Sequence, residues 1–279
     1  MLSSVGYNLH ISKFTQLGNS LIQLSNAINV GIQKKSKVIM PKTAVNPEVL
    51  DFLSGVPDFD FRTPDACGID LESKFYFQNQ CFGYDLTNKE RRRILKDFVF
   101  SHLPIVDSDG ITEDTLVIHI RSGDIFGEWI HQNYVQPPLS YYKKIIEETK
   151  PSNILIVTQP DRKNPCVDSL LSLYPNIKIQ SGTLQQDVSA ILNARKLVIG
   201  FGTFGWILSM MSDRIHTLHC PTICTDVLSS FYSSPPFEIN RYDFEEYIKI
   251  GDWKNSESQR EIMINHPTEK IGKHHVIEY

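Results

Sequence analysis

The sequence lacks several features that mark well-defined classes of protein. It contains no apolar run of about 18 residues, so no membrane-spanning helix is predicted. Its first residues have neither the charged start nor the long apolar centre of a secretory signal peptide. The scattered cysteines form neither a CxxC pair nor a Cys/His zinc pattern, so reduced thiols are expected. Together these absences predict a cytoplasmic protein without a membrane span.

An excess of positive charge is also missing. The chain has 28 basic and 32 acidic residues, which gives a net charge of −4 and an isoelectric point near 6.1. Because a protein that binds nucleic acid needs a basic face, no nucleic-acid partner is predicted. Hydrophobic residues make up 41% of the 279 residues and charged residues 22%, which is typical of a globular chain with one large or two small domains.

Familiar nucleotide and metal motifs give little direction. No Walker A lysine loop occurs, and the run Gly200–Gly205 is not interpreted as a dinucleotide-binding fingerprint. A Rossmann-like dehydrogenase is therefore the disfavoured alternative. Two DxD patterns, at 58–60 and 107–109, stand in a proline-rich region and in a plain turn, so no metal site is predicted.

One apolar run that ends in polar residues organises the rest of the chain. Leu116–Ile118 has the β-branched content of a buried strand, and alternation then places His119 and Arg121 on one face. Gly123 allows a turn, and Asp124 is the first carboxylate beyond it. A His, an Arg and an Asp therefore gather where a strand stops, which is where open α/β sheets bind ligands.

Two interpretations of this strand end are open. The guanidinium of Arg121 offers a planar set of donors that suits a phosphate and stays charged at any working pH. Alternatively, Arg121 and Asp124 form an ion pair that fixes a turn, while His119 is hydrogen-bonded in the core.

Alternation of strands and helices predicts an α/β protein with parallel, Rossmann-like sheets. The first part reads as a βαβ unit, with a strand at 5–11, a helix at 19–34 and a strand at 37–40. Gly18 and Asn19 stand at the helix entrance, where free N–H groups attract an anion or a sugar hydroxyl.

The second part shows the alternation more clearly. Beyond the central strand, further strands are predicted at 153–158, 177–179, 196–200 and 215–219, with helices at 138–148, 166–174, 185–194 and 202–211. We expect an N-terminal α/β domain over 1–110 and a C-terminal Rossmann-like domain over 111–225. Residues 226–279 are expected to form an irregular tail across the domains, with one helix near 244–250.

Three strand ends of the second domain should meet at one edge of its sheet, because the strands run parallel. These ends are 119–124, 158–161 and 200–204. At the third, Gly202 and Thr203 open a helix whose N–H groups offer a cradle for a diphosphate. Phe204 could instead be ordinary core packing.

Three blocks of the sequence resemble one enzyme group. His119–Asp124 (HIRSGD) is similar to the HxRxGD strand end of the fucosyltransferase superfamily, which covers α-1,2-, α-1,6- and protein O-fucosyltransferases. Leu17–Leu21 resembles that group's GN loop, and Asp187–Leu192 with Val198–Phe204 resembles its later run of helix, strand and Ser/Thr-Phe turn. The blocks fall in the family's order and span residues 6 to 213.

The resemblance implies a GT-B glycosyltransferase with two Rossmann-like domains facing a cleft, which inverts the anomeric centre without a metal or other cofactor. Its partners would be a nucleotide-sugar donor linked to GDP or UDP and a glycan acceptor. GDP-fucose is the family default, and UDP-xylose or another nucleotide sugar is the alternative. The lack of a membrane anchor separates the chain from Golgi enzymes and suggests a bacterial or virus-encoded setting.

The resemblance also implies residue roles. Arg121 would hold the donor diphosphate, and Gly18 and Asn19 would face the phosphate or the acceptor from the other domain. Ser122 stands where many members have a second arginine. The residues expected to bind the donor are His119, Arg121, Thr158, Asp187, Gly202, Thr203 and Phe204.

Catalysis of transfer also needs a base for the acceptor hydroxyl. Asp124 is the first candidate, Glu128 the second and His131 the third, because all three follow the turn after the central strand. A module that binds a nucleotide or a glycan without transferring a sugar is the remaining alternative.

Overall fold

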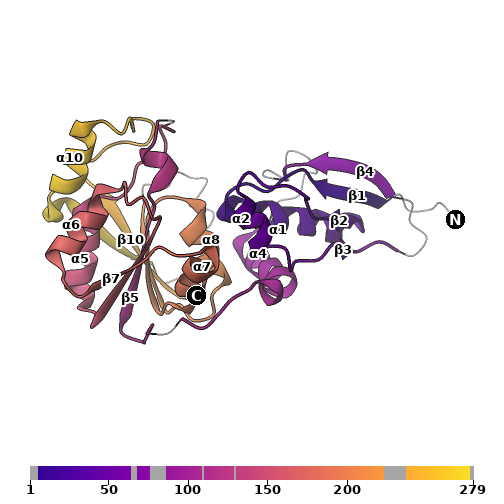
Figure 1. Cartoon of the computed structure of the whole chain (residues 1–279), viewed down its shortest axis with the longest axis horizontal. Helices are drawn as coiled ribbons and strands as arrows, with labels where there is room; N and C mark the ends of the chain where they lie inside the picture. The colour runs from indigo at the N-terminus through magenta and orange to yellow at the C-terminus, as the bar shows by residue number, and fades with distance from the viewer. Residues whose placement is uncertain are drawn as a thin grey trace. The chain divides into compact units, whose positions relative to one another are not determined.

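Two α/β units make up the chain, residues 1–104 and 105–279 (Figure 1). The computed structural model describes residues 6–63, 68–75, 86–108, 110–128, 130–222 and 237–276. Asp109 of the second DxD pattern lies outside the described residues. Two cysteines are described, Cys166 and Cys220; both are buried, and neither forms a disulfide within the described residues. None of the helices in the described ranges is long and apolar enough to cross a membrane.

A four-stranded sheet of order β3-β2-β1-β4 carries the first unit. Strand β1 (Gly6–Ile11) pairs in parallel with β2 (Lys37–Ile39) and β4 (Gly68–Ser73), whereas β3 (Phe59–Asp60) is antiparallel to β2. Helix α1 (Leu17–Lys34) connects β1 to β2 and completes the predicted βαβ unit. It buries an apolar stripe with helical spacing, which explains why its pattern was readable from the sequence.

Shorter helices complete this unit. Helix α2 (Pro47–Phe52) begins with a proline and is capped by the Asn46 side chain. Helix α4 (Asn88–Ile94) begins with a capping box between Thr87 and Glu90. It continues through a π-helical turn, η1 (Leu95–Val99), and a 3-10 turn, η2 (Phe100–His102).

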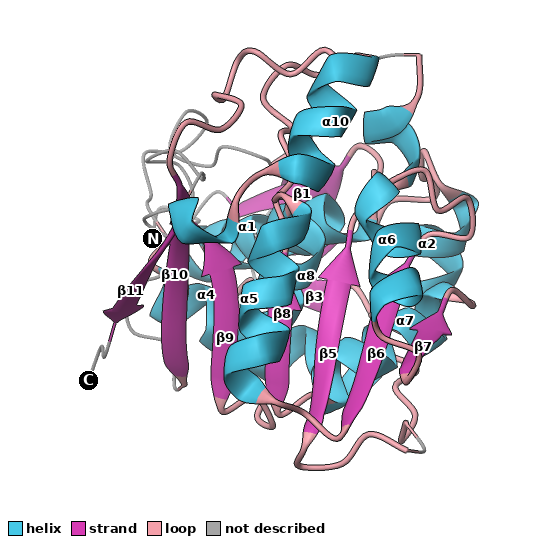
Figure 2. Cartoon of the chain, turned by 90° about the vertical axis from the view of Figure 1, so that its left-hand side faces the viewer, coloured by secondary structure: helices cyan, strands magenta, loops and turns pink. Residues whose placement is uncertain are grey.

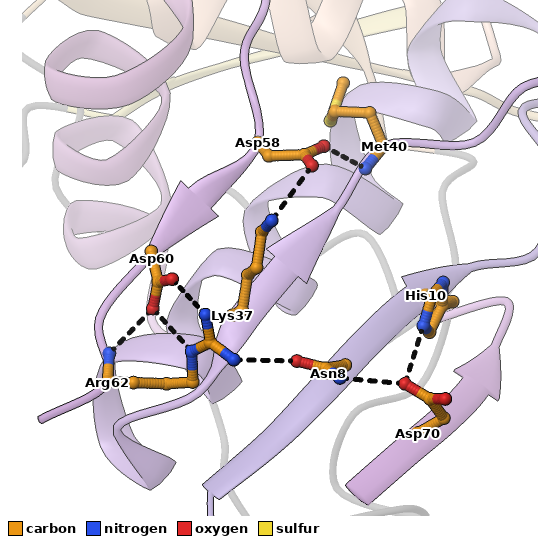
Figure 3. Close-up of polar contacts among 8 residues, drawn as sticks. All are labelled: Asn8, His10, Lys37, Met40, Asp58, Asp60, Arg62 and Asp70. Atoms are coloured by element: carbon orange, nitrogen blue, oxygen red, sulfur yellow. Dashed lines mark hydrogen bonds and ion pairs between the residues drawn. The ribbon is translucent and has the colours of Figure 1, made fainter. Parts of the chain in front are cut away.

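One face of this sheet carries connected polar side chains (Figure 3). Asn8 donates to Asp70 over 2.8 Å and accepts from Arg62 over 3.1 Å, so its amide joins two strands and a loop. The imidazole of His10 also lies 3.1 Å from Asp70. These contacts are solvent-exposed, so each adds little stability, and they hold the polar groups of β1 and β4 in register.

The second unit is built on a seven-stranded sheet of order β11-β10-β9-β8-β5-β6-β7. Its strands are β5 (Thr115–Ile120), β6 (Asn153–Thr158), β7 (Ile177–Gln180), β8 (Lys196–Ile199), β9 (Thr217–Pro221), β10 (Glu238–Phe244) and β11 (Ile271–Val276). All neighbours pair in parallel except β11, which is antiparallel to β10.

Helices cover both faces of this sheet, as a parallel sheet requires. They are α5 (Leu139–Thr149), α6 (Pro165–Leu173), α7 (Leu184–Asn193), α8 (Thr203–Met211) and α10 (Glu257–Asn265), with 3-10 turns η3 (Gly123–Phe126) and η5 (Thr268–Lys270). Figures 1 and 2 show α5, α6 and α10 on one face and α7 and α8 on the other. The strands and helices predicted between 116 and 219 are therefore confirmed, with bounds that differ by a few residues.

The prediction of an irregular tail after residue 225 is wrong for the described part. Strands β10 and β11 extend the sheet, and α10 contacts α5 and α6. The helix predicted near 244–250 is a turn and loop instead. The pattern was weak because α10 buries a single residue, Met263, and because β10 mixes buried and half-exposed positions near the sheet edge.

Trp253, between β10 and α10, fastens this C-terminal part to the loop after β5. Its side chain is fully buried, and its indole N–H donates to the carbonyl of Ile125 over 3.2 Å. Its ring packs edge-on against Phe126, with 5.6 Å between centroids. The loop that follows β5 is therefore held in place by a residue more than a hundred positions away in the sequence.

Candidate functional site

The order of the strands locates a ligand site in the second unit. From β5 the chain runs outward through β6 to β7, and it then crosses back to β8 and continues through β9 and β10. The direction of winding thus reverses between β5 and β8. In open parallel sheets, ligands bind outside the carboxyl ends of the strands at this switch point. Arg121 follows β5, and Gly202 follows β8, so the two predicted site segments flank the switch point.

The side chain of Arg121 extends from the end of β5 toward the start of α8. A methyl group built on Gly202 would lie 3.1 Å from Nη1 of Arg121, so the guanidinium approaches the start of α8. Nη2 of Arg121 donates to both carboxylate oxygens of Asp124, each over 3.2 Å. The guanidinium carbon also lies 4.7 Å from the ring centroid of Tyr134. The predicted ion pair between Arg121 and Asp124 and the predicted approach to the helix start are both present.

Glycines shape the start of α8. Gly202, the N-cap residue, has φ 134° and ψ 165°, a conformation that residues with a side chain avoid, and its own lack of a side chain leaves room for Arg121. The N-cap residue Gly202 has no side chain that could cap the helix, and no acidic residue stands in the first turn. The positive end of the helix dipole therefore meets no side-chain anion from this turn, which favours an external anion there.

The run Gly200–Gly205 does have the GxGxxG spacing, contrary to its interpretation in the sequence. It follows β8 and opens α8, which is the context that gives the motif meaning. A methyl group on Gly205 would lie 2.8 Å from Ile199 of β8, so the third glycine permits close packing of helix on strand. The signal was present in the sequence and should have strengthened the prediction of a diphosphate site.

His119 and Phe204 lie beside Arg121 on the α8 side of the sheet. Their rings are 5.1 Å apart between centroids, and Nδ1 of His119 lies 3.1 Å from a methyl group built on Gly205. Burial and the nearby charge of Arg121 lower the pKa of His119 to about 4. The imidazole is therefore neutral near pH 7, and the strand end carries the positive charge of Arg121 alone.

Residues from the predicted strand ends 119–124 and 158–161, together with Asn164, which was not predicted, hold the backbone at Arg121. The hydroxyl of Ser122 donates to Asp161 over 2.7 Å, and the amide N–H of Ser122 donates to the side chain of Gln159 over 2.7 Å. Asn164 donates from its side chain to the carbonyl of Arg121 over 3.0 Å. Ser122 is fully buried and has this structural role. The Asn164-Pro165 pair is a helix-start signal, which could have identified Asn164 as a residue at the start of α6, near the ends of the strands.

Two predicted site residues, Thr158 and Asp187, have other surroundings. Thr158 is 3% exposed at the end of β6, on the same side of the strand as core residue Ile156, so its side chain lies on the face of the sheet opposite to His119 and Arg121. Asp187 accepts from the N–H of Gly182 over 3.3 Å and from Gln180 over 3.4 Å, and so fixes the loop before α7. The donor roles of Thr158 and Asp187 stay predictions.

The remaining candidates are accessible or belong to the other unit. Glu128 and His131 are exposed in the segment after η3, and His131 packs against Tyr134 with 4.7 Å between ring centroids. Gly18 and Asn19 lie in the first turn of α1, which begins at Leu17, so Asn19 is not an N-cap. They remain predicted contacts of the first unit.

The described DxD carboxylates take part in ion pairs. Asp58 lies 3.6 Å from Lys37, and Asp60 contacts Arg62, which lowers the pKa of Asp60 to about 2 (Figure 3). Asp107 lies 3.7 Å from Arg214. Across the described ranges, no group of three or more His, Cys, Asp or Glu side chains is arranged to hold a metal ion.

Comparison with known proteins gives a likeness in fold. No family model and no curated protein matches the chain. The heptosyltransferase TibC, a dodecameric iron-containing protein solved with ADP-D-beta-D-heptose, matches with a TM-score of 0.53 and 14% identity, over 96% of this chain and 75% of that one. A second structure of TibC, from enterotoxigenic E. coli H10407, matches with a TM-score of 0.52 and 15% identity, over 96% and 77%. The chain has the GT-B fold of these proteins.

The pKa of His119 predicts how stability depends on pH. Its value in the folded protein, about 4, is below the ordinary 6.5, so the unfolded chain binds more protons between these pH values. Stability should therefore fall as the pH drops from 6.5 to 4, and His119→Asn should weaken this dependence. Urea unfolding at several pH values measures it, with exposed His102→Asn as the control. Some dependence of stability on pH should remain in His119→Asn, because the pKa of His219 is also lowered to about 4. Equal pH dependence of stability in wild type and His119→Asn would contradict the buried environment assigned to His119.

Proposed function

We propose that this protein is a GT-B glycosyltransferase that moves a sugar from a nucleoside-diphosphate donor to a glycan hydroxyl with inversion. The observation that carries the proposal is the approach of Arg121 Nη1 to Gly202 at the start of α8, beside the switch point. A diphosphate placed there would meet a fixed cation on one side and backbone N–H groups on the other. Both are the groups that bind phosphates most strongly in proteins.

These two groups would act mainly on the leaving group. As the acceptor hydroxyl attacks the anomeric carbon, the bond to the diphosphate breaks and negative charge grows on the phosphate oxygen. Arg121 and the α8 N–H groups would stabilise that charge more in the transition state than in the bound donor, which is the requirement for catalysis. The donor enters as a substrate, and no step here needs a resident cofactor.

The identity of the donor rests on two lines of support. The HIRSGD block resembles fucosyltransferases, which makes GDP-fucose the first candidate, with UDP-xylose as the alternative. TibC, which shares the fold, was solved with ADP-D-beta-D-heptose, so an ADP-linked heptose is a further candidate donor. An NAD-dependent dehydrogenase is less well supported, because Pro221 and Thr222, at the end of β9, offer no carboxylate for a ribose.

Replacing Arg121 tests the proposal. Arg121→Ala should lower the release of nucleoside diphosphate from the productive donor by about 100- to 1,000-fold, the usual cost of removing a group that stabilises developing charge. The assay uses GDP-fucose, UDP-xylose and ADP-heptose with a glycan acceptor library. Arg195→Ala is the matched control, because Arg195 is similarly half-buried and paired with Glu113 over 2.9 Å but stands at the opposite, amino edge of the sheet.

Three results of this assay and of matching binding measurements would decide between the candidate functions. Normal turnover by Arg121→Ala would remove Arg121 from the mechanism. Tight binding of GDP, UDP or ADP without any sugar transfer would identify a non-catalytic nucleotide-binding module. Binding of NAD(H) in preference to all three diphosphates would favour the dehydrogenase.

The contact with Arg121 changes the order of the candidate bases. In an inverting displacement, the attacking and leaving oxygens lie on opposite sides of the anomeric carbon. Asp124 touches the guanidinium proposed to hold the leaving diphosphate, which puts it on the wrong side for the acceptor. Glu128 is exposed and forms no ion pair within the described part of the chain, so we propose it as the base.

Substitution by the isosteric amide separates the two carboxylates. Glu128→Gln should lower kcat by about 100- to 10,000-fold with little change in donor KM, as expected for loss of a general base. Asp124→Asn should act mainly on donor KM, because its amide still fits beside Arg121. A large loss of kcat in Asp124→Asn with normal Glu128→Gln would restore Asp124 as the base.

A further inference from the structure

Tyr134 is an aromatic residue that packs on the guanidinium of Arg121 beside the proposed diphosphate site. Its ring centroid lies 4.7 Å from the guanidinium carbon of Arg121 and 5.5 Å from the ring centroid of Phe201. The ring of His131 also packs against it, with 4.7 Å between centroids. Tyr134 is half-buried, and its hydroxyl forms no hydrogen bond within the described residues. The ring, not the hydroxyl, therefore makes its contacts.

The loop that carries Tyr134 is tied to the loop that carries the start of α8. The side-chain amide of Gln136, a fully buried residue, donates to the carbonyls of Tyr134 and Phe201, each over 3.4 Å. Phe201 directly precedes Gly202, the N-cap of α8. Tyr134 thus touches Arg121 with its ring while its backbone is linked to the segment from which the helix begins.

Two residues then fix one guanidinium. Asp124 accepts hydrogen bonds from Nη2 and the Tyr134 ring packs on the group, while Nη1 is directed toward Gly202. An aromatic ring stacked on an arginine restricts its rotation yet leaves its N–H groups free to bind a ligand. A flexible arginine would instead lose side-chain entropy when it binds a phosphate, at a cost to affinity.

We propose that Tyr134 is a positioning residue for the donor diphosphate, which holds Arg121 Nη1 in place against the start of α8. This inference rests on the proposed function, because it assigns Tyr134 to the same site. It places no contact between Tyr134 and the ligand. Its effect should therefore appear only in the part of the affinity that the diphosphate supplies, and only while Arg121 is present.

Calorimetry on the full chain tests this role with GDP, UDP and ADP and with guanosine, uridine and adenosine. Tyr134→Leu should weaken the binding of the preferred diphosphate by about 2- to 30-fold, the range of cation–π contacts, and leave its nucleoside unchanged. Tyr134→Phe should bind like wild type because it keeps the ring.

Tyr174→Leu is the matched control. Tyr174 is a tyrosine of similar exposure at the C-terminal end of α6, toward the amino edge of the sheet and away from the proposed site. Thermal melting verifies folding, and Tyr134→Gln serves if the leucine variant does not fold.

A double-mutant cycle decides whether Tyr134 acts through Arg121. In an Arg121→Met background, Tyr134→Leu should change diphosphate affinity by less than about 2-fold. Equal losses for nucleoside and diphosphate, or an undiminished loss in the Arg121→Met background, would overturn the positioning role while leaving the proposed function intact. Failure of Arg121→Met itself to weaken diphosphate binding would instead overturn the proposed site.

Discussion

The approach of the Arg121 guanidinium to the start of α8 is the interaction on which the rest of this account depends. It joins the ends of β5 and β8, the two strands between which the winding of the sheet reverses. Gly202 makes the approach possible because a side chain there would meet Nη1 at 3.1 Å. A cation and a helix N-terminus that face the same small space create a strong local preference for an anion, and a diphosphate has the matching charge and size.

Most neighbouring contacts hold this arrangement in place. Asn164 and the buried Ser122 fix the backbone at Arg121, and Tyr134 and Asp124 fix its side chain. Behind them, Trp253 from the C-terminal part is buried against the loop that follows β5. A preorganised site of this kind gains affinity because less side-chain freedom is lost on binding. The seven-stranded sheet thus supplies the position, and the loops supply the rigidity.

The elements nearest this interaction were predictable from the sequence because their signals are local. The run Leu116–Ile118 indicated a buried strand, its alternation put His119 and Arg121 on one face, and the α/β order implied that strand ends meet. Individual contacts between loops left no such signal: nothing near Arg121 points to the side chain of Asn164, and Tyr134 follows no periodic pattern. The tail was missed because α10 buries a single residue and β10 mixes buried and half-exposed positions.

The most direct test is a crystal structure of the full chain with the nucleoside diphosphate that it binds most tightly. The account predicts that the diphosphate lies within hydrogen-bonding distance of Arg121 Nη1 and of the backbone N–H groups that begin α8. It also predicts that the Tyr134 ring remains stacked on Arg121 without touching the phosphates. A diphosphate bound away from the ends of β5 and β8, with Arg121 still paired only to Asp124, would contradict the central claim.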